Sequence, residues 1–65
     1  MDELTNEEII ILNRCEELGL TIEEATMMLL IFEDATKIQK KKILNKLLFV
    51  ENMEELVDLF VDNTK

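Results

Sequence analysis

The chain has 65 residues, and 15 acidic side chains against seven basic ones give it a formal net charge of −8. A chain of this length forms one domain at most, so we expect a single domain over residues 1–65. It buries only about 60% of the surface that its unfolded form exposes, so its stability is marginal. The negative charge argues against nucleic acid or an anionic membrane as the partner. The chain has one cysteine and no histidine, which excludes an intrachain disulfide and a structural zinc site.

Four capping residues predict where helices begin. Each is followed three positions later by Glu or Gln, as in the capping box, where the cap side chain accepts from a first-turn N–H and the Glu or Gln accepts from the cap's own N–H. The four pairs are Thr5 with Glu8, Thr21 with Glu24, Thr36 with Gln39, and Asn52 with Glu55. We therefore predict an all-α fold, a compact bundle of about four short helices with irregular, orthogonal-like packing.

The first predicted helix runs from about residue 6 to 18. Gly19 is expected to end it in the left-handed conformation, with Leu20 folding back onto the last turn. Residues 9–12 are all apolar, which is more than one buried face of a helix can hold. Cys15 lies among apolar neighbours, so we interpret it as a small buried core residue rather than a reactive thiol.

The second predicted helix, about 22–33, is apolar nearly all round from residue 27 to residue 32. Its expected inner face is Ile22, Ala25, Met28, Leu29 and Phe32. A helix that is apolar all round is either central in the fold or part of an exposed patch, and the apolar excess in residues 9–12 favours a patch. We predict a protein interface, most simply covered by a homodimer, that consists of Ile10, Ile11, Met27, Leu30 and Ile31.

The third predicted helix, about 37–50, has a wide apolar stripe and carries no acid. The stripe consists of Ile38, Ile43, Leu44, Leu47, Leu48 and Phe49. The polar face carries five lysines, Lys37, Lys40, Lys41, Lys42 and Lys46. These lysines either neutralise acidic neighbours or form a basic docking strip. Nucleic-acid contact is a third interpretation, although the surrounding field is repulsive and no aromatics stand between the lysines to stack bases. A fourth helix, about 53–62, is cleanly amphipathic.

The segment 15–25 has the local pattern of a helix-turn-helix, with a small residue four before the glycine, a capping Thr after it and an alanine six after it. Its second helix would present glutamate and apolar side chains to DNA, which cannot hold phosphates, so we interpret it as a tight helical hairpin. The same stretch, under half of the chain, resembles the two-helix hook of Sin-type antirepressors. That resemblance implies docking on the dimerisation helices of a repressor.

The residues for catalysis are missing. There is no histidine or serine and only one glycine, so we expect neither an enzyme nor a cofactor or metal. The longest apolar run is residues 27–32, too short for a membrane span. We predict a cytoplasmic, small acidic protein-binding regulator, an antirepressor, inhibitor or adaptor of the kind that a phage or mobile element encodes. The alternatives are an assembly protein that only self-associates and a nucleic-acid binder that uses the third helix.

Overall fold

The computed structural model describes residues 3–64, so residues 1, 2 and 65 of the predicted domain lie outside the described residues. Four helices and no strand occupy this part of the chain. They are α1 (Asn6–Glu17), α2 (Ile22–Asp34), α3 (Lys37–Leu47) and α4 (Met53–Asp62). The prediction of a compact all-α bundle of about four short helices is confirmed.

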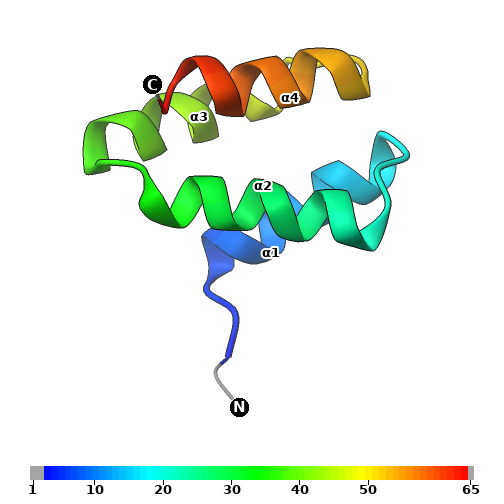
Figure 1. Ribbon diagram of the computed structural model, residues 1–65, viewed down its shortest axis with the longest axis horizontal. Helices are drawn as coiled ribbons and strands as arrows, with labels where there is room; N and C mark the ends of the chain where they lie inside the picture. Colours follow the sequence, from blue (N-terminus) through cyan, green and yellow to red (C-terminus); the bar gives the residue numbers. More distant parts are fainter. Residues whose placement is uncertain (1–2, 65) are drawn as a thin grey trace.

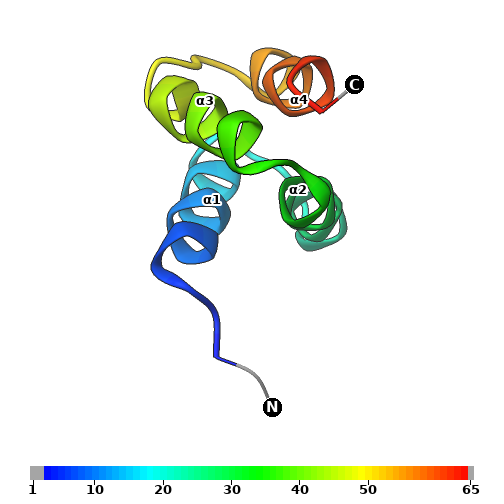
Figure 2. The same ribbon diagram turned by 90° about the vertical axis from the view of Figure 1, so that its left-hand side faces the viewer.

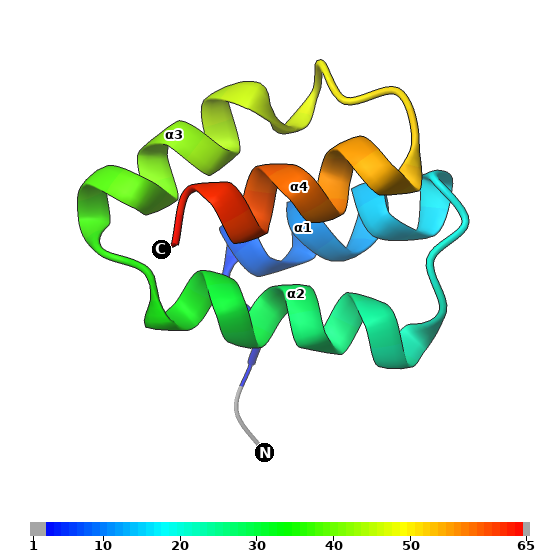
Figure 3. The same cartoon turned by 45° about the horizontal axis from the view of Figure 1, so that its top comes forward.

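The helices form two layers, with α1 beside α2 and α3 beside α4 (Figure 1). Each helix packs against one neighbour in its own layer and one in the other layer, in the order α1, α2, α4, α3 around the bundle. In Figure 2, α2 and α4 are seen along their axes whereas α1 and α3 are seen obliquely, so the packing is irregular. Figure 3 shows that α3 and α4 run in opposite directions and lie side by side.

The helix starts follow the capping prediction, with one difference. Complete capping boxes begin α1, α2 and α3 at Thr5, Thr21 and Thr36. At α4 the side chain of Asn52 accepts from the N–H of Glu55 at 2.9 Å, as predicted. The Glu55 carboxylate, however, accepts from the N–H of Glu51 at 2.8 Å, one residue before the cap. The fourth box is therefore only half formed.

Gly19 ends α1 as predicted. Its φ of +88° lies in the left-handed region that favours glycine. The N–H of Leu20 donates to the carbonyl of Cys15 at 2.9 Å, and the N–H of Gly19 donates to that of Glu16 at 3.1 Å. These two bonds form a Schellman motif. The turn lets the chain reverse and places Leu20 in the core.

The core lies between the two layers and receives side chains from all four helices. Its largest completely buried members are Phe60, Ile11, Ile43, Leu47, Leu56 and Cys15. No polar or charged residue is buried among residues 3–64. The core is therefore entirely apolar, and the predicted burial of Cys15 is confirmed.

Burial of Cys15 has a measurable consequence. It raises the pKa of the thiol from an ordinary 9.0 to about 11, because the thiolate is poorly solvated inside an apolar core. The stability that comes from burying the protonated Cys15 thiol is complete below pH 9, where the folded and the unfolded chain both keep the proton. It is lost as the pH rises from 9 to 11, because only the unfolded chain ionises in that range. We expect the urea midpoint to fall over this range by more than it does in Cys15→Ala. Equal falls in the two proteins would contradict this account.

Four apolar side chains that were expected to face inward are exposed. One of them is Ile38, which is 71% exposed in the first turn of α3. The prediction was wrong for Ile22, which is 86% exposed in the first turn of α2. It was also wrong for Leu48 and Phe49, which are 73% and 80% exposed. These two residues follow the end of α3, since the helix stops at Leu47 rather than near Val50. They therefore do not continue its buried stripe.

Arg14 contacts the chain where α3 ends. Its Nε donates to the carbonyl of Leu47 at 3.3 Å, and its Nη2 donates to the carbonyl of Val50. The guanidinium thus satisfies the carbonyl of the last residue of α3, which has no partner within the helix, and a carbonyl in the connection that follows. A side chain of α1 in this way fixes the start of the α3–α4 connection.

Candidate protein-interaction surfaces

The residues of the predicted interface fall into three environments. Met27 and Leu30 are each 58% exposed on α2. Ile31 is half-buried and packs against the core. Ile11 is completely buried, so its assignment to a surface was wrong. It lies on the inward side of α1 beside Cys15, at the helical spacing of i and i+4.

Ile10 is exposed, but it lies on a different side of the molecule from Met27 and Leu30. It shares a helix side with Arg14, four residues later, and Arg14 reaches the end of α3. The side of α1 that faces α2 is instead marked by Leu12, which lines a shallow depression between these two helices. The structure therefore does not join Ile10 to the apolar residues of α2.

Met27 and Leu30 belong to one outward row on α2, which we call the α2 stripe. Its members are Glu23, Met27, Leu30 and Asp34, spaced i, i+4, i+7 and i+11. All four are exposed. The stripe has two large apolar side chains at its centre and a carboxylate at each end. Such an arrangement suits a partner with an apolar centre and basic flanks.

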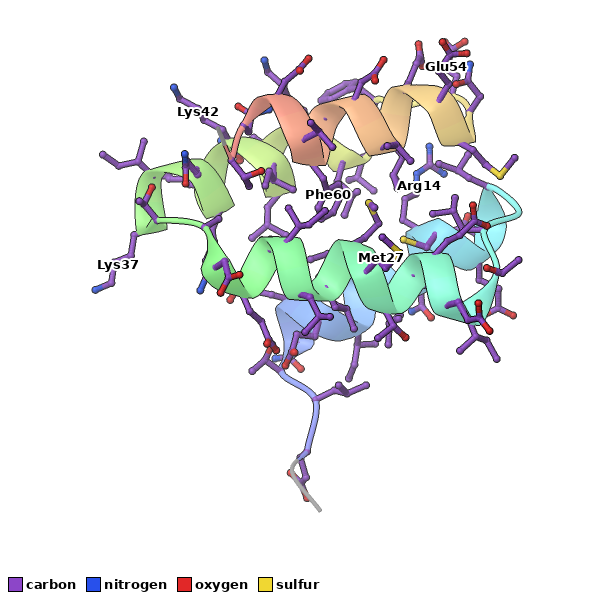
Figure 4. The ribbon with its side chains drawn as sticks, in the orientation of Figure 1. Arg14, Met27, Lys37, Lys42, Glu54 and Phe60 are labelled. Atoms are coloured by element: carbon purple, nitrogen blue, oxygen red, sulfur yellow. The ribbon has the colours of Figure 1, made fainter. Side chains whose placement is uncertain are left out.

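The five lysines of α3 do not form one continuous strip. Lys37, Lys40 and Lys41 line a depression between α1 and α3, together with Leu44, Asn45 and Glu7. The side chains of Lys42 and Lys46 lie on the other side of the helix, 100° or more around from Lys41 in helical projection. Figure 4 shows Lys42 projecting from the layer of α3 and α4, on the side away from α2. One long docking strip is thereby replaced by two smaller basic areas.

Lys40 is the lysine most involved with its own molecule. Its Nζ lies 5.5 Å from the ring centroid of Phe32, a cation–π distance. Nearby, a hydrogen bond from the N–H of Thr5 lowers the pKa of the Glu8 carboxyl. Hydrogen bonding to Glu8, and the charge of that carboxylate, raise the pKa of Glu33, while Lys40 opposes this rise. Lys40 thus offsets repulsion where α1 meets the end of α2.

Two features of the surface were missed from sequence. The first is Arg14, whose neighbours in sequence gave no sign of its hydrogen bonds to residues 33 and 36 positions away. The second is the exposed pair Leu48 and Phe49 after α3. A capping signal three residues later, at Asn52, indicated where α4 begins but not where α3 ends. Both features depend on tertiary contacts.

The described residues show no prepared chemical centre. Over residues 3–64, no group of three or more Cys, Asp or Glu side chains is placed to hold a metal ion. None of the four helices has the length and apolar character that crossing a bilayer requires, within the same residues. The depression between α1 and α2, about 370 Å³, is lined by Leu12, Glu16, Leu20, Thr21, Ile22 and Ala25. Its lining is mostly apolar and offers a single carboxylate.

Comparison of the chain with protein-family models, with curated proteins and with solved structures found no significant match.

Proposed function

We propose that this protein is a small, non-catalytic protein-binding regulator, of the antirepressor, inhibitor or adaptor type, and that it binds its partner through the α2 stripe. The observation that supports this proposal is the exposure of Met27 and Leu30 on a helix whose other side is packed into an apolar core. Large apolar side chains exposed together on a small domain are typical of an interaction site.

The charges at the ends of the α2 stripe favour a different protein over a second copy of this chain. If two α2 helices paired about a twofold axis in antiparallel fashion, Glu23 would face Asp34 of the other copy. If they paired in parallel, each carboxylate would face its own equivalent. Both arrangements bring like charges together, which is unfavourable at an interface. A partner helix or groove with Lys or Arg at its edges has no such penalty.

Leu30→Asp is the variant that tests the stripe. It places a third carboxylate at the centre of the apolar contact and should weaken partner binding about tenfold or more, because a central apolar anchor contributes roughly 1.5–3 kcal/mol. The measurement is capture from a lysate of the source organism, identification of the captured protein, and titration calorimetry with that protein once purified. The helix itself should lose only about 0.5 kcal/mol from the lower propensity of Asp.

Ile10→Asp is the matched control. Ile10 is 47% exposed, also lies within a helix, and receives the same change of charge. Its variant should keep full affinity because Ile10 lies away from the α2 stripe. A partner that binds Leu30→Asp as tightly as the original chain would overturn the proposal. Retardation of nucleic acid in a gel, with no protein captured, would favour the nucleic-acid alternative.

A further inference from the structure

The side of the bundle formed by α2 and α4 carries a second apolar row beside the α2 stripe. Figure 2 shows α2 and α4 on one side of the molecule and α1 and α3 on the other, and α2 packs directly against α4. Both of these helices begin at the same end of the bundle (Figure 3). A partner that lies on the α2 stripe therefore has α4 within its reach.

The apolar row on α4 follows the spacing i, i+4 and i+8 and consists of Met53, Val57 and Val61. Its first and last members are 44% and 39% exposed, and the middle one is half-buried against the core. A Cβ atom at Gly19 would lie 4.0 Å from the Sδ of Met53, so the row begins beside the turn between α1 and α2. On the opposite flank of α4, Glu55 accepts from the N–H of Glu51 in the connection from α3. The row thus follows the α2 side of α4.

The flank of α2 that meets this row carries Met27 and Ile31. Ile31 comes nine positions after Ile22, which places the two on opposite sides of the helix, and Ile22 lines the depression on the α1 side. Ile31 therefore faces α4, and Figure 4 shows Met27 on the α4 side of α2. We call the combined surface the α2–α4 face, which consists of Met27, Leu30, Ile31, Met53, Val57 and Val61.

The charge of both helices is wholly acidic. Each has four acidic residues and no basic one, whereas the basic residues of the described part of the chain lie on α1 and α3. Exposed carboxylates border the α2–α4 face, and within residues 3–64 none of the four forms an ion pair. They are Glu23 and Asp34 on α2 and Glu54 and Asp58 on α4. Two copies of this face would repel each other, whereas a partner with Lys or Arg at its edges would be attracted.

A helix is the partner element that fits this face. The backbone groups in the middle of α2 and α4 are bonded within their own helices, so the face offers an extended peptide no free N–H or carbonyl to pair with. A partner helix satisfies its own backbone. Packed helices lie about 8–10 Å apart, so a third helix can rest on α2 and α4 together. The 13 residues of α2 give this contact a length of about 20 Å.

We propose that the α2–α4 face binds a basic amphipathic helix of a different protein. The apolar side of that helix lies on the face, and its Lys and Arg side chains lie toward the bordering carboxylates. The two exposed methionines, Met27 and Met53, suit such a surface because their unbranched side chains adapt to the shape of a partner. This inference rests on the proposed function, to which it adds α4 and the structural class of the partner.

A pair of synthetic peptides tests the class of partner. The first has about 18 residues of leucine and lysine, with the leucines at i, i+3, i+4 and i+7 along one side of a helix. The second has the same residues in an order that spreads the leucines around the helix. By titration calorimetry at about 0.15 M salt, the first should bind the full chain about tenfold or more tightly than the second. The methyl signals of Met27 and Met53 should shift when it binds.

Val61→Lys tests the part that α4 plays. Val61 is exposed, so the variant should fold normally by circular dichroism, but it places an ammonium group in the apolar contact and beside the lysines of the peptide. Affinity should fall about tenfold or more. Ile10→Lys makes the same change of charge at an exposed residue of α1. This control should keep the affinity of the original chain, because Ile10 lies away from the α2–α4 face.

Three results would overturn the inference. They are equal affinity for the two peptides, unchanged affinity in Val61→Lys, and a doubled mass of the chain alone that Val61→Lys abolishes, since the occupant would then be a second copy. Failure of the proposed function would look different. In that case Leu30→Asp would bind the captured partner as tightly as the original chain. Loss of the captured partner in Leu30→Asp but not in Val61→Lys would leave the proposed function in place and remove α4 from the site.

Discussion

Replacing Phe60 with alanine is expected to lower the free energy of unfolding by about 3–5 kcal/mol, the usual result of removing a buried aromatic side chain. Phe60 is completely buried and lies between the two layers (Figure 4), so α1 and α2 cannot move in to fill the cavity without losing their own contacts. A domain of 65 residues has a total stability of roughly 3–10 kcal/mol. The variant should therefore be largely unfolded near 37 °C.

Phe49→Ala provides the comparison. The change of residue is the same, but Phe49 is 80% exposed after the end of α3, so its loss should alter stability by less than about 0.5 kcal/mol. Urea unfolding followed by helical circular dichroism would measure both. Equal losses of stability in the two variants would mean that Phe60 is not in a packed core.

Arg14→Ala is expected to lower the free energy of unfolding by about 2–3 kcal/mol. The guanidinium donates to the carbonyls of Leu47 and Val50, and hydrogen bonds that involve a charged group contribute roughly 1.5–3 kcal/mol. The side chain is only 20% exposed, so water replaces those bonds poorly. In a domain of this size, such a loss lowers the melting temperature by about 10–20 °C.

Two further variants separate the hydrogen bonds from the other roles of Arg14. Arg14→Met keeps most of the apolar stem and should recover only the packing part of the loss. Glu17→Gln removes the ion pair with an exposed carboxylate and should change stability by less than about 1 kcal/mol. If Glu17→Gln were as damaging as Arg14→Ala, the ion pair rather than the carbonyl contacts would be the important interaction.

The parts of the fold that could be predicted from sequence are those determined by neighbouring residues. A cap such as Thr21 and its Glu24 lie within one helical turn, so the start of α2 follows from four residues. Gly19 is similar, because only glycine takes its φ of +88° without strain. The end of α3 is different. The carbonyl of its last residue, Leu47, accepts from Arg14, which is distant in sequence. The neighbouring residues did not indicate the end, and the prediction extended the helix too far.

The candidate surfaces were harder to predict for a geometric reason. In a run such as Ile9 to Leu12, successive side chains point about 100° apart, and nothing in the run states which one faces the core. The structure buries Ile11 and exposes Ile10. On α2, the predicted inner face that included Ala25, Met28 and Phe32 left Met27 and Leu30 pointing outward, and both are exposed.

The capping boxes also bear on how this protein can change over evolutionary time. Because two residues near each helix start set where α1, α2 and α3 begin, the outward positions of these helices contribute little to specifying the fold. Substitutions there are free to alter affinity or partner while the scaffold persists. A lineage carrying this bundle could therefore exchange binding specificities one surface at a time, with the lysines of α3 varying independently of the α2–α4 face.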